Sequence, residues 1–115
     1  MLSTHYAPTT PLTIHSTELI SESAQKLASQ GLYVIVITWS EQHNASTASP
    51  LTNPLIQQVA MPSDPINYGK QLYATLRQYD QGVFDQLLIE APPNHPSWLA
   101  IMDRLHRACH NKNNV

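Results

Sequence analysis

Charged residues are scarce in this chain of 115 residues, and several classes of protein are excluded by what it lacks. They make up 12% of the sequence against about 25% in typical domains. With a net charge of −2 and six lysines and arginines, the chain is not expected to bind nucleic acid by itself. The single cysteine, Cys109, excludes an internal disulfide and a zinc site built from several cysteines.

Long apolar runs and targeting signals are also missing. No apolar run approaches the roughly 20 residues needed to span a bilayer. Residues 1–11 have neither the basic nor the apolar region of a signal peptide. We therefore expect a cytoplasmic protein without a membrane contact.

The common motifs for phosphate binding and covalent catalysis do not occur. There is no G-x-G-x-x-G, no Walker A lysine and no G-x-S-x-G, and the three glycines are scattered along the chain. What the chain does have is a hydrophobic content of 42%, which is sufficient for the core of one small domain.

Apolar segments of two periodicities alternate along that domain. The first helix is expected after Ser16 or Thr17 as N-cap, and Gly31 is expected to end it. A second helix is expected from Asp64, with Pro65 in the first helical position, and a third from Pro96. The order predicts an α/β fold: a Rossmann-like three-layer domain with a mainly parallel sheet of about four strands. The predicted strands cover 12–15, 32–39, 55–60 and 84–90, and the polar segment 40–53 is expected to be a loop.

Buried and exposed positions of the last two helices can also be predicted. Tyr73 falls on an apolar stripe and is expected in the core, whereas Tyr68 and Tyr79 are expected at its margins with their hydroxyls in water. The stripe of the final helix is expected to contain Trp98, Met102, Leu105 and Cys109.

Polar residues follow the predicted strands, where open parallel sheets bind ligands. Ser16 and Asp64 also suit helix capping, and capping is the more economical interpretation for them. A catalytic role at this edge is therefore the less favoured interpretation. The residues concerned are His15, Ser16, Ser40, Glu41, Ser63, Asp64 and Glu90.

The last helix contains one possible metal-binding cluster. His106 and His110 are four residues apart, with Cys109 between them. No third histidine lies in the local sequence, and positive charge near a helix C-terminus is favourable without a metal. No metal site is predicted.

The segment His5-Tyr6-Ala7-Pro8 precedes every predicted core element, so no core requires it. Together with residues 1–4 it resembles the linker of long-form threonylcarbamoyl-AMP synthases. The resemblance continues in family order and spacing through 61–65, 72–77 with Asp80, 88–93 and 103–108. It covers essentially the whole chain except the 40–53 loop and the tail.

The resemblance implies a C-terminal regulatory, lid-bearing domain without catalytic residues, metal or cofactor of its own. Its partner would be an N-terminal YrdC-like catalytic domain of the same chain, which joins threonine, bicarbonate and ATP, with magnesium, into threonylcarbamoyl-AMP for tRNA modification. By resemblance, His5 and Tyr6 would face the bound nucleotide. Residues 1–11 would be the linker, 12–110 the domain and 111–115 a frayed tail.

Two expectations complete the interpretation. The isolated chain should be inactive, and residues 1–11 should lack order without their partner domain because they have few apolar anchors. The alternative from a different class is an independent Rossmann-like module that binds a nucleotide or a small metabolite at its strand ends.

Overall fold

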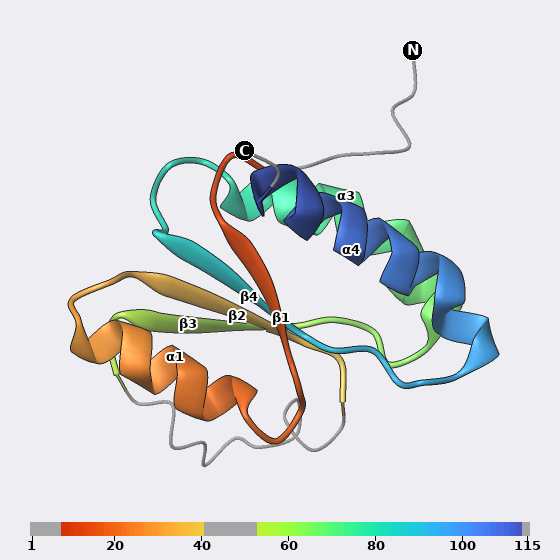
Figure 1. Ribbon diagram of the computed structural model, residues 1–115, viewed down its shortest axis with the longest axis horizontal. Helices are drawn as coiled ribbons and strands as arrows, with labels where there is room; N and C mark the ends of the chain where they lie inside the picture. Colours follow the sequence, from red (N-terminus) through yellow and green to blue (C-terminus); the bar gives the residue numbers. More distant parts are fainter. Residues whose placement is uncertain (1–7, 41–52, 114–115) are drawn as a thin grey trace.

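The computed structural model describes residues 8–40 and 53–113, which form one sheet with helices on both faces (Figure 1). The strands are β1 (Leu12–His15), β2 (Val34–Thr38), β3 (Ile56–Ala60) and β4 (Gln86–Glu90), and the helices are α1 (Ile20–Ser29), α3 (Pro65–Tyr79), the 3-10 turn η1 (Pro96–Trp98) and α4 (Leu99–Asn113).

The sheet has four strands in the order β1-β4-β2-β3, and each of the pairings between them is parallel. The last strand in sequence, β4, lies between the first two: Leu87 is opposite both Leu12 of β1 and Ile35 of β2. The predicted α/β fold with a parallel sheet of four strands is confirmed.

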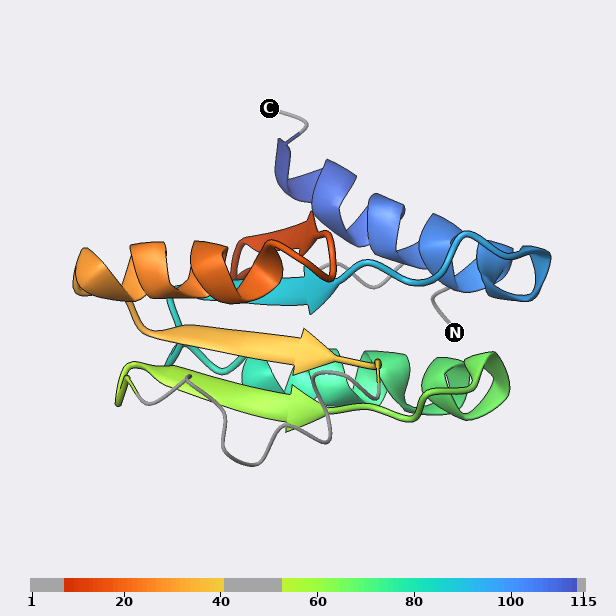
Figure 2. The same ribbon diagram turned by 90° about the horizontal axis from the view of Figure 1, so that it is seen from below.

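Alternate side chains of the strands define the layers. Val34, Val36 and Leu88 pack against α1 on one face, whereas Ile35 and Leu87 belong to the larger core on the face covered by α3 and α4. Figure 2 shows α1 and α3 on opposite sides of the sheet. All five residues of β2 are buried, which explains why its sequence is apolar without alternation.

Two predicted helix boundaries are confirmed by their geometry. The Asp64 carboxylate accepts a hydrogen bond from the Asn67 N–H at 2.9 Å, and Pro65 opens α3. Gly31 follows α1 with φ +86°, a conformation that favours glycine.

The start of α1 is a correction. Neither Ser16 nor Thr17 is its N-cap, because the helix begins at Ile20 after Leu19. The Ser16 carbonyl instead accepts hydrogen bonds from the N–H groups of Leu19 and Ile20, and a turn precedes the helix.

The tyrosines of α3 also differ from expectation. Tyr68 is 1% exposed and forms part of the core, whereas Tyr73 is half-buried at its margin. Tyr68 lies four residues before Leu72 and eight before Leu76, and the three share the buried face of α3. The Tyr68 ring is covered by Trp98, which comes from a distant part of the sequence.

In α4 two of the predicted stripe residues, Trp98 and Leu105, are buried, and the other two positions of the stripe differ. Ile101 and Ala108 are buried with Trp98 and Leu105, while Met102 and Cys109 are half-buried. Both stripes have helical spacing, and the choice between them depends on where the sheet and α3 lie. The helix continues to Asn113, three residues into the expected tail.

Residues 8–11 are packed against the domain, so the expected lack of order is wrong for this part of the linker. Pro8 is buried, Thr10 is 6% exposed, and the Pro11 carbonyl accepts a hydrogen bond from the Leu87 N–H at 2.8 Å. His5 and Tyr6 lie outside the described residues. Within the described ranges, no helix has the length and apolar character needed to cross a membrane.

Candidate functional site

The segment before β1, which was expected to be part of a linker, is held by one carboxylate, that of Asp80. Its Oδ1 accepts hydrogen bonds from the Thr9 hydroxyl at 3.0 Å, the Thr10 N–H at 2.9 Å and the Thr10 hydroxyl at 2.7 Å. Its Oδ2 accepts from the Thr9 N–H at 3.0 Å. We call Thr9, Thr10 and Asp80 the linker clamp; it joins segments about 70 residues apart in sequence.

The local sequence explains why these groups meet. Pro8 and Pro11 lack N–H groups, so Thr9 and Thr10 supply both backbone donors of this segment, and Asp80 accepts from both. Asp80 follows the last residue of α3, and Gly82 with φ +85° then turns the chain toward β4. The end of α3 is thereby held beside the start of β1.

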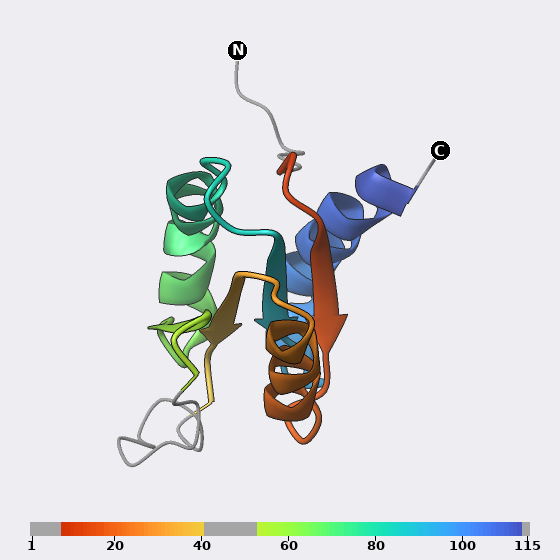
Figure 3. The same ribbon diagram turned by 90° about the vertical axis from the view of Figure 1, so that its left-hand side faces the viewer.

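The linker clamp lies at the edge of the sheet where the strands begin. Figure 3 shows β1 and β4 running from the edge where the described chain enters to the opposite edge. The polar residues expected to form a ligand site follow the strands at that opposite edge. The two candidate regions are therefore separated by the length of the strands.

At the carboxyl edge, Glu90 joins the ends of two strands. It is 0% exposed, and its Oε1 accepts hydrogen bonds from the N–H groups of Trp39 at 2.9 Å and Ser40 at 3.1 Å. The Trp39 indole donates to the Ala91 carbonyl at 2.7 Å. Glu90 thus acts as a bridge between the ends of β2 and β4, and its Oε2 has no hydrogen-bond partner among the described residues.

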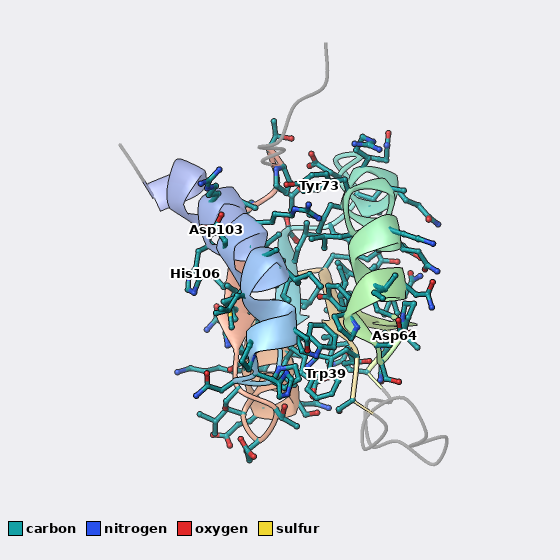
Figure 4. All side chains as sticks on the ribbon, turned by 90° about the vertical axis from the view of Figure 1, so that its right-hand side faces the viewer. Trp39, Asp64, Tyr73, Asp103 and His106 are labelled. Carbon is teal, nitrogen blue, oxygen red and sulfur yellow. The ribbon has the colours of Figure 1, made fainter. Side chains whose placement is uncertain are left out.

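Three aromatic rings cluster near this carboxylate. The Trp98 ring centre lies 5.2 Å from that of Tyr68 and 5.6 Å from that of Trp39, which projects beyond the sheet near the starts of α3 and α4 (Figure 4). The Tyr68 hydroxyl is buried without a hydrogen-bond partner in the described structure. Burial, and secondarily the nearby Glu90 carboxylate, raise the pKa of Tyr68, so this phenol stays protonated and cannot serve as a base near neutral pH.

The other polar residues expected at this edge have local partners or are exposed. His15 Nε2 lies 2.7 Å from the Thr13 hydroxyl, and burial lowers the pKa of its imidazole. The Ser16 hydroxyl accepts from the Leu19 N–H at 3.3 Å, and Ser63 is exposed. Only Ser40 and Glu90 are brought together, and Glu41 lies outside the described residues. The arrangement favours a structural role for this edge.

The possible metal cluster on α4 stays untested as a whole. His106 points away from the sheet (Figure 4). Burial raises the pKa of the Cys109 thiol to about 11, and the side chain of His110 is not among those described. In the described part of the chain, no three His, Cys, Asp or Glu side chains could hold a metal ion together.

A groove of about 360 Å³ between α3 and α4 was missed from the sequence. Its walls include Ile66 and Ala100, Gly69 leaves it open in the middle, and Lys70 and Arg104 provide positive charge. The sequence signal was the glycine within an amphipathic helix, which can mark a close helix contact. That contact could not be assigned without knowing which helix faces α3.

The fold and the linker clamp define a parallel α/β domain whose preceding segment is fastened to it by side-chain hydrogen bonds. Residues 1–109 match the family described as "Threonylcarbamoyl-AMP synthase, C-terminal domain". The chain belongs to this family. It is also 32% identical over 110 residues to a threonylcarbamoyl-AMP synthase of Bacillus subtilis, covering 94% of this chain and 30% of the relative.

A solved structure supports the fold separately. The crystal structure of P. abyssi Sua5 complexed with L-threonine superposes with a TM-score of 0.69 at 22% identity, over 92% of this chain and 30% of that chain. At this identity the likeness establishes the fold alone. The chain spans about a third of the length of the proteins it matches, which are therefore larger than this domain.

Proposed function

We propose that this chain is the linker-bearing domain of a protein that makes threonylcarbamoyl-AMP from threonine, bicarbonate and ATP. The observation that carries the proposal is the linker clamp, which directly follows His5-Tyr6-Ala7-Pro8 in sequence and holds Thr9 and Thr10 to the end of α3. Family membership and the larger size of the relatives support a partner domain in the same protein. That partner is an N-terminal YrdC-like catalytic domain.

In this function the linker acts as a lid. His5 and Tyr6 approach the nucleotide held by the catalytic domain, and an aromatic ring and an imidazole exclude water from the reacting groups. Water exclusion matters because the carboxylated threonine and the mixed anhydride formed from it are both labile. ATP, with magnesium, is a substrate of the catalytic domain, and no residue of this chain carries out the chemical step.

The product would serve modification of a tRNA adenosine in the cytoplasm. This domain has no direct part in binding the tRNA in this proposal, because the whole chain has a net charge of −2 and only six lysines and arginines. Its contribution is to place the lid and to hold it there between reaction cycles.

One observation favours the second candidate, an independent module that binds a nucleotide or a small metabolite. The groove between α3 and α4 has two cations, Lys70 and Arg104, at its border. A phosphate group could be attracted there by charge alone.

Two measurements on the isolated chain separate the candidates. The lid-bearing domain should release no pyrophosphate from ATP in the presence of threonine and bicarbonate, and should show no saturable ATP binding in calorimetry. Threonine-dependent pyrophosphate release would refute the assignment of chemistry to another domain. Saturable ATP binding that is lost in the double variant Lys70→Ala/Arg104→Ala would establish the independent module instead.

A further inference from the structure

We propose that Asp80 is a positioning residue: its carboxylate fixes the point and the direction in which the lid segment leaves the domain. This inference rests on the proposed lid function. It assigns a role in the reaction to a residue at the end of α3, which contacts no substrate in this account.

The hydrogen bonds of Asp80 are those of a clamp. Three donors converge on Oδ1 and one on Oδ2, and they include the backbone N–H and the hydroxyl of both Thr9 and Thr10. Hydrogen bonds to an ionised acceptor are stronger than neutral ones. Since both backbone and side chain of each threonine are held, rotation of the segment about its own axis is restricted as well as translation.

A role in helix capping does not explain this carboxylate. Asp80 lies directly after the last residue of α3, where the helix dipole places partial negative charge and favours cations. A negative side chain there is unfavourable for the helix itself. The four hydrogen bonds from Thr9 and Thr10 offset this cost and explain why a carboxylate suits the position.

The clamp lies close enough to the lid to control it. Tyr6 and His5 are two and three residues before Pro8, which corresponds to at most about 7 and 11 Å of extended chain. The ring of Pro8 restricts its own backbone, and Pro8 is buried against the domain. A change of direction at Thr9 therefore displaces the lid residues, and misplacement by about 1 Å can lower a rate about a hundredfold.

The clamp itself is tested by amide exchange in the chain of 115 residues. Asp80→Ala should speed exchange of the Thr9 and Thr10 amides at least about tenfold, and Asp80→Asn, which keeps one acceptor oxygen, should have a smaller effect. The matched control is Asp85→Asn: Asp85 Oδ2 accepts from the Tyr33 N–H at 2.8 Å, far from the linker in sequence. It should affect Tyr33 and leave both threonines protected.

The positioning role is tested in the longer protein that contains the catalytic domain. Asp80→Ala should lower kcat at least about tenfold without a matching fall in Tm, Asp80→Asn should restore part of the rate, and Asp85→Asn should have wild-type kinetics. Thr10→Val removes one hydroxyl donor and provides a milder variant if Asp80→Ala does not fold. It should give a smaller fall in kcat in the same direction.

Two results would overturn the inference alone, and a third would overturn it together with the lid function. Unchanged exchange at Thr9 and Thr10 in Asp80→Ala would show that there is no clamp. If Asp80→Ala shows faster exchange but wild-type kcat, while His5→Ala/Tyr6→Ala has a lowered kcat, the lid function would stand and the positioning role of Asp80 would be refuted. Wild-type kcat in both variants would refute the lid function, and with it the role of Asp80.

Discussion

Replacing Tyr68 with phenylalanine should stabilise this domain. The Tyr68 side chain is 1% exposed, and its hydroxyl has no hydrogen-bond partner among the described residues. The ring packs edge-on against Trp98 at 5.2 Å between centres. Phenylalanine keeps that ring contact and removes only the buried hydroxyl, which loses its hydrogen bonds to water when the protein folds.

The magnitude follows from the cost of leaving a polar group unpaired. Burying a hydroxyl without a partner costs about 1–3 kcal/mol, so Tyr68→Phe should raise the free energy of unfolding by about 1–2 kcal/mol. For a domain of this size Tm should rise by about 4–8 °C. Tyr33→Phe is the control: its ring packs on Phe84, its side chain is 37% exposed, and its stability should change by less than about 0.5 kcal/mol.

The pH dependence of stability provides a second, independent test of Tyr68→Phe. Burial and the nearby Glu90 carboxylate raise the pKa of Tyr68 in the folded state above its ordinary value of 10.0. Above pH 10 the unfolded chain releases the phenolic proton while the folded chain keeps it, so the unfolded state binds fewer protons and stability falls as pH rises. The phenylalanine variant lacks this loss, and its advantage should widen by up to about 1.4 kcal/mol per pH unit above pH 10.

Urea denaturation at about pH 7, 9 and 11 measures both effects. Other titrating groups are common to the two proteins, so the difference between them isolates Tyr68. A variant less stable than the wild type by about 1 kcal/mol or more would refute the reasoning. The hydroxyl would then have a partner, such as a buried water shared with Glu90 Oε2, which has no hydrogen-bond partner among the described residues.

Three further outcomes can be checked on the isolated domain. Asp64→Ala should lower Tm at neutral pH, because hydrogen bonds from Asn67 lower the pKa of Asp64 in the folded state below 3.8. The stabilisation by this carboxylate is present above pH 3.8 and is lost as pH falls through the lowered pKa, so the difference in Tm between variant and wild type should narrow in acid. Cys109 should be alkylated much more slowly than free cysteine at about pH 8 and at full rate in denaturant, since burial raises the pKa of its thiol to about 11; equal rates would contradict this. Gly82→Ala should destabilise the domain by about 1–2 kcal/mol, because φ at this position is +85°. Gly69→Ala should stabilise it by up to about 1 kcal/mol, because Gly69 lies inside α3 and the new Cβ would be 3.8 Å from Arg104 Nη1. Denaturation midpoints of the two variants that move in the same direction would contradict these two expectations.

Local features of the fold could be predicted from sequence because their causes are local. The apolar run at β2 marks a strand buried on both faces, and Asp64 followed by Pro65 marks a helix start. The parallel α/β class follows from the alternation of such elements. These predictions depend on neighbouring residues alone, and the structure confirms them.

Features that depend on distant residues could not be predicted. The position of β4 between β1 and β2 depends on pairing across about 70 residues, for which a single sequence carries no direct signal. The face of α4 that is buried depends on where α3 and the sheet lie, and Ile101 and Ala108 take the places expected for Met102 and Cys109. The burial of Tyr68, expected at the margin with its hydroxyl in water, differs for the same reason: Trp98, which packs on its ring, comes from another element.

The same distinction applies to the candidate site. The family of the chain could be recognised from short motifs that include Asp80, but the contact of Asp80 with Thr9 and Thr10 could not be predicted. Both threonines lie in a segment expected to lack order. The four hydrogen bonds arise only when the end of α3 is placed beside the start of β1.

The most direct test of the lid function is the rate of threonylcarbamoyl-AMP formation by His5→Ala/Tyr6→Ala in the longer protein. We predict a clear fall in rate and in retention of the adenylate, with little change in Tm because both residues precede every core element. Leu105→Ala is the matched control: Leu105 is fully buried, so stability should fall by about 2–5 kcal/mol while turnover per folded molecule stays at the wild-type level. Wild-type turnover and wild-type retention of the adenylate in the double variant would contradict the account and leave the linker as a tether.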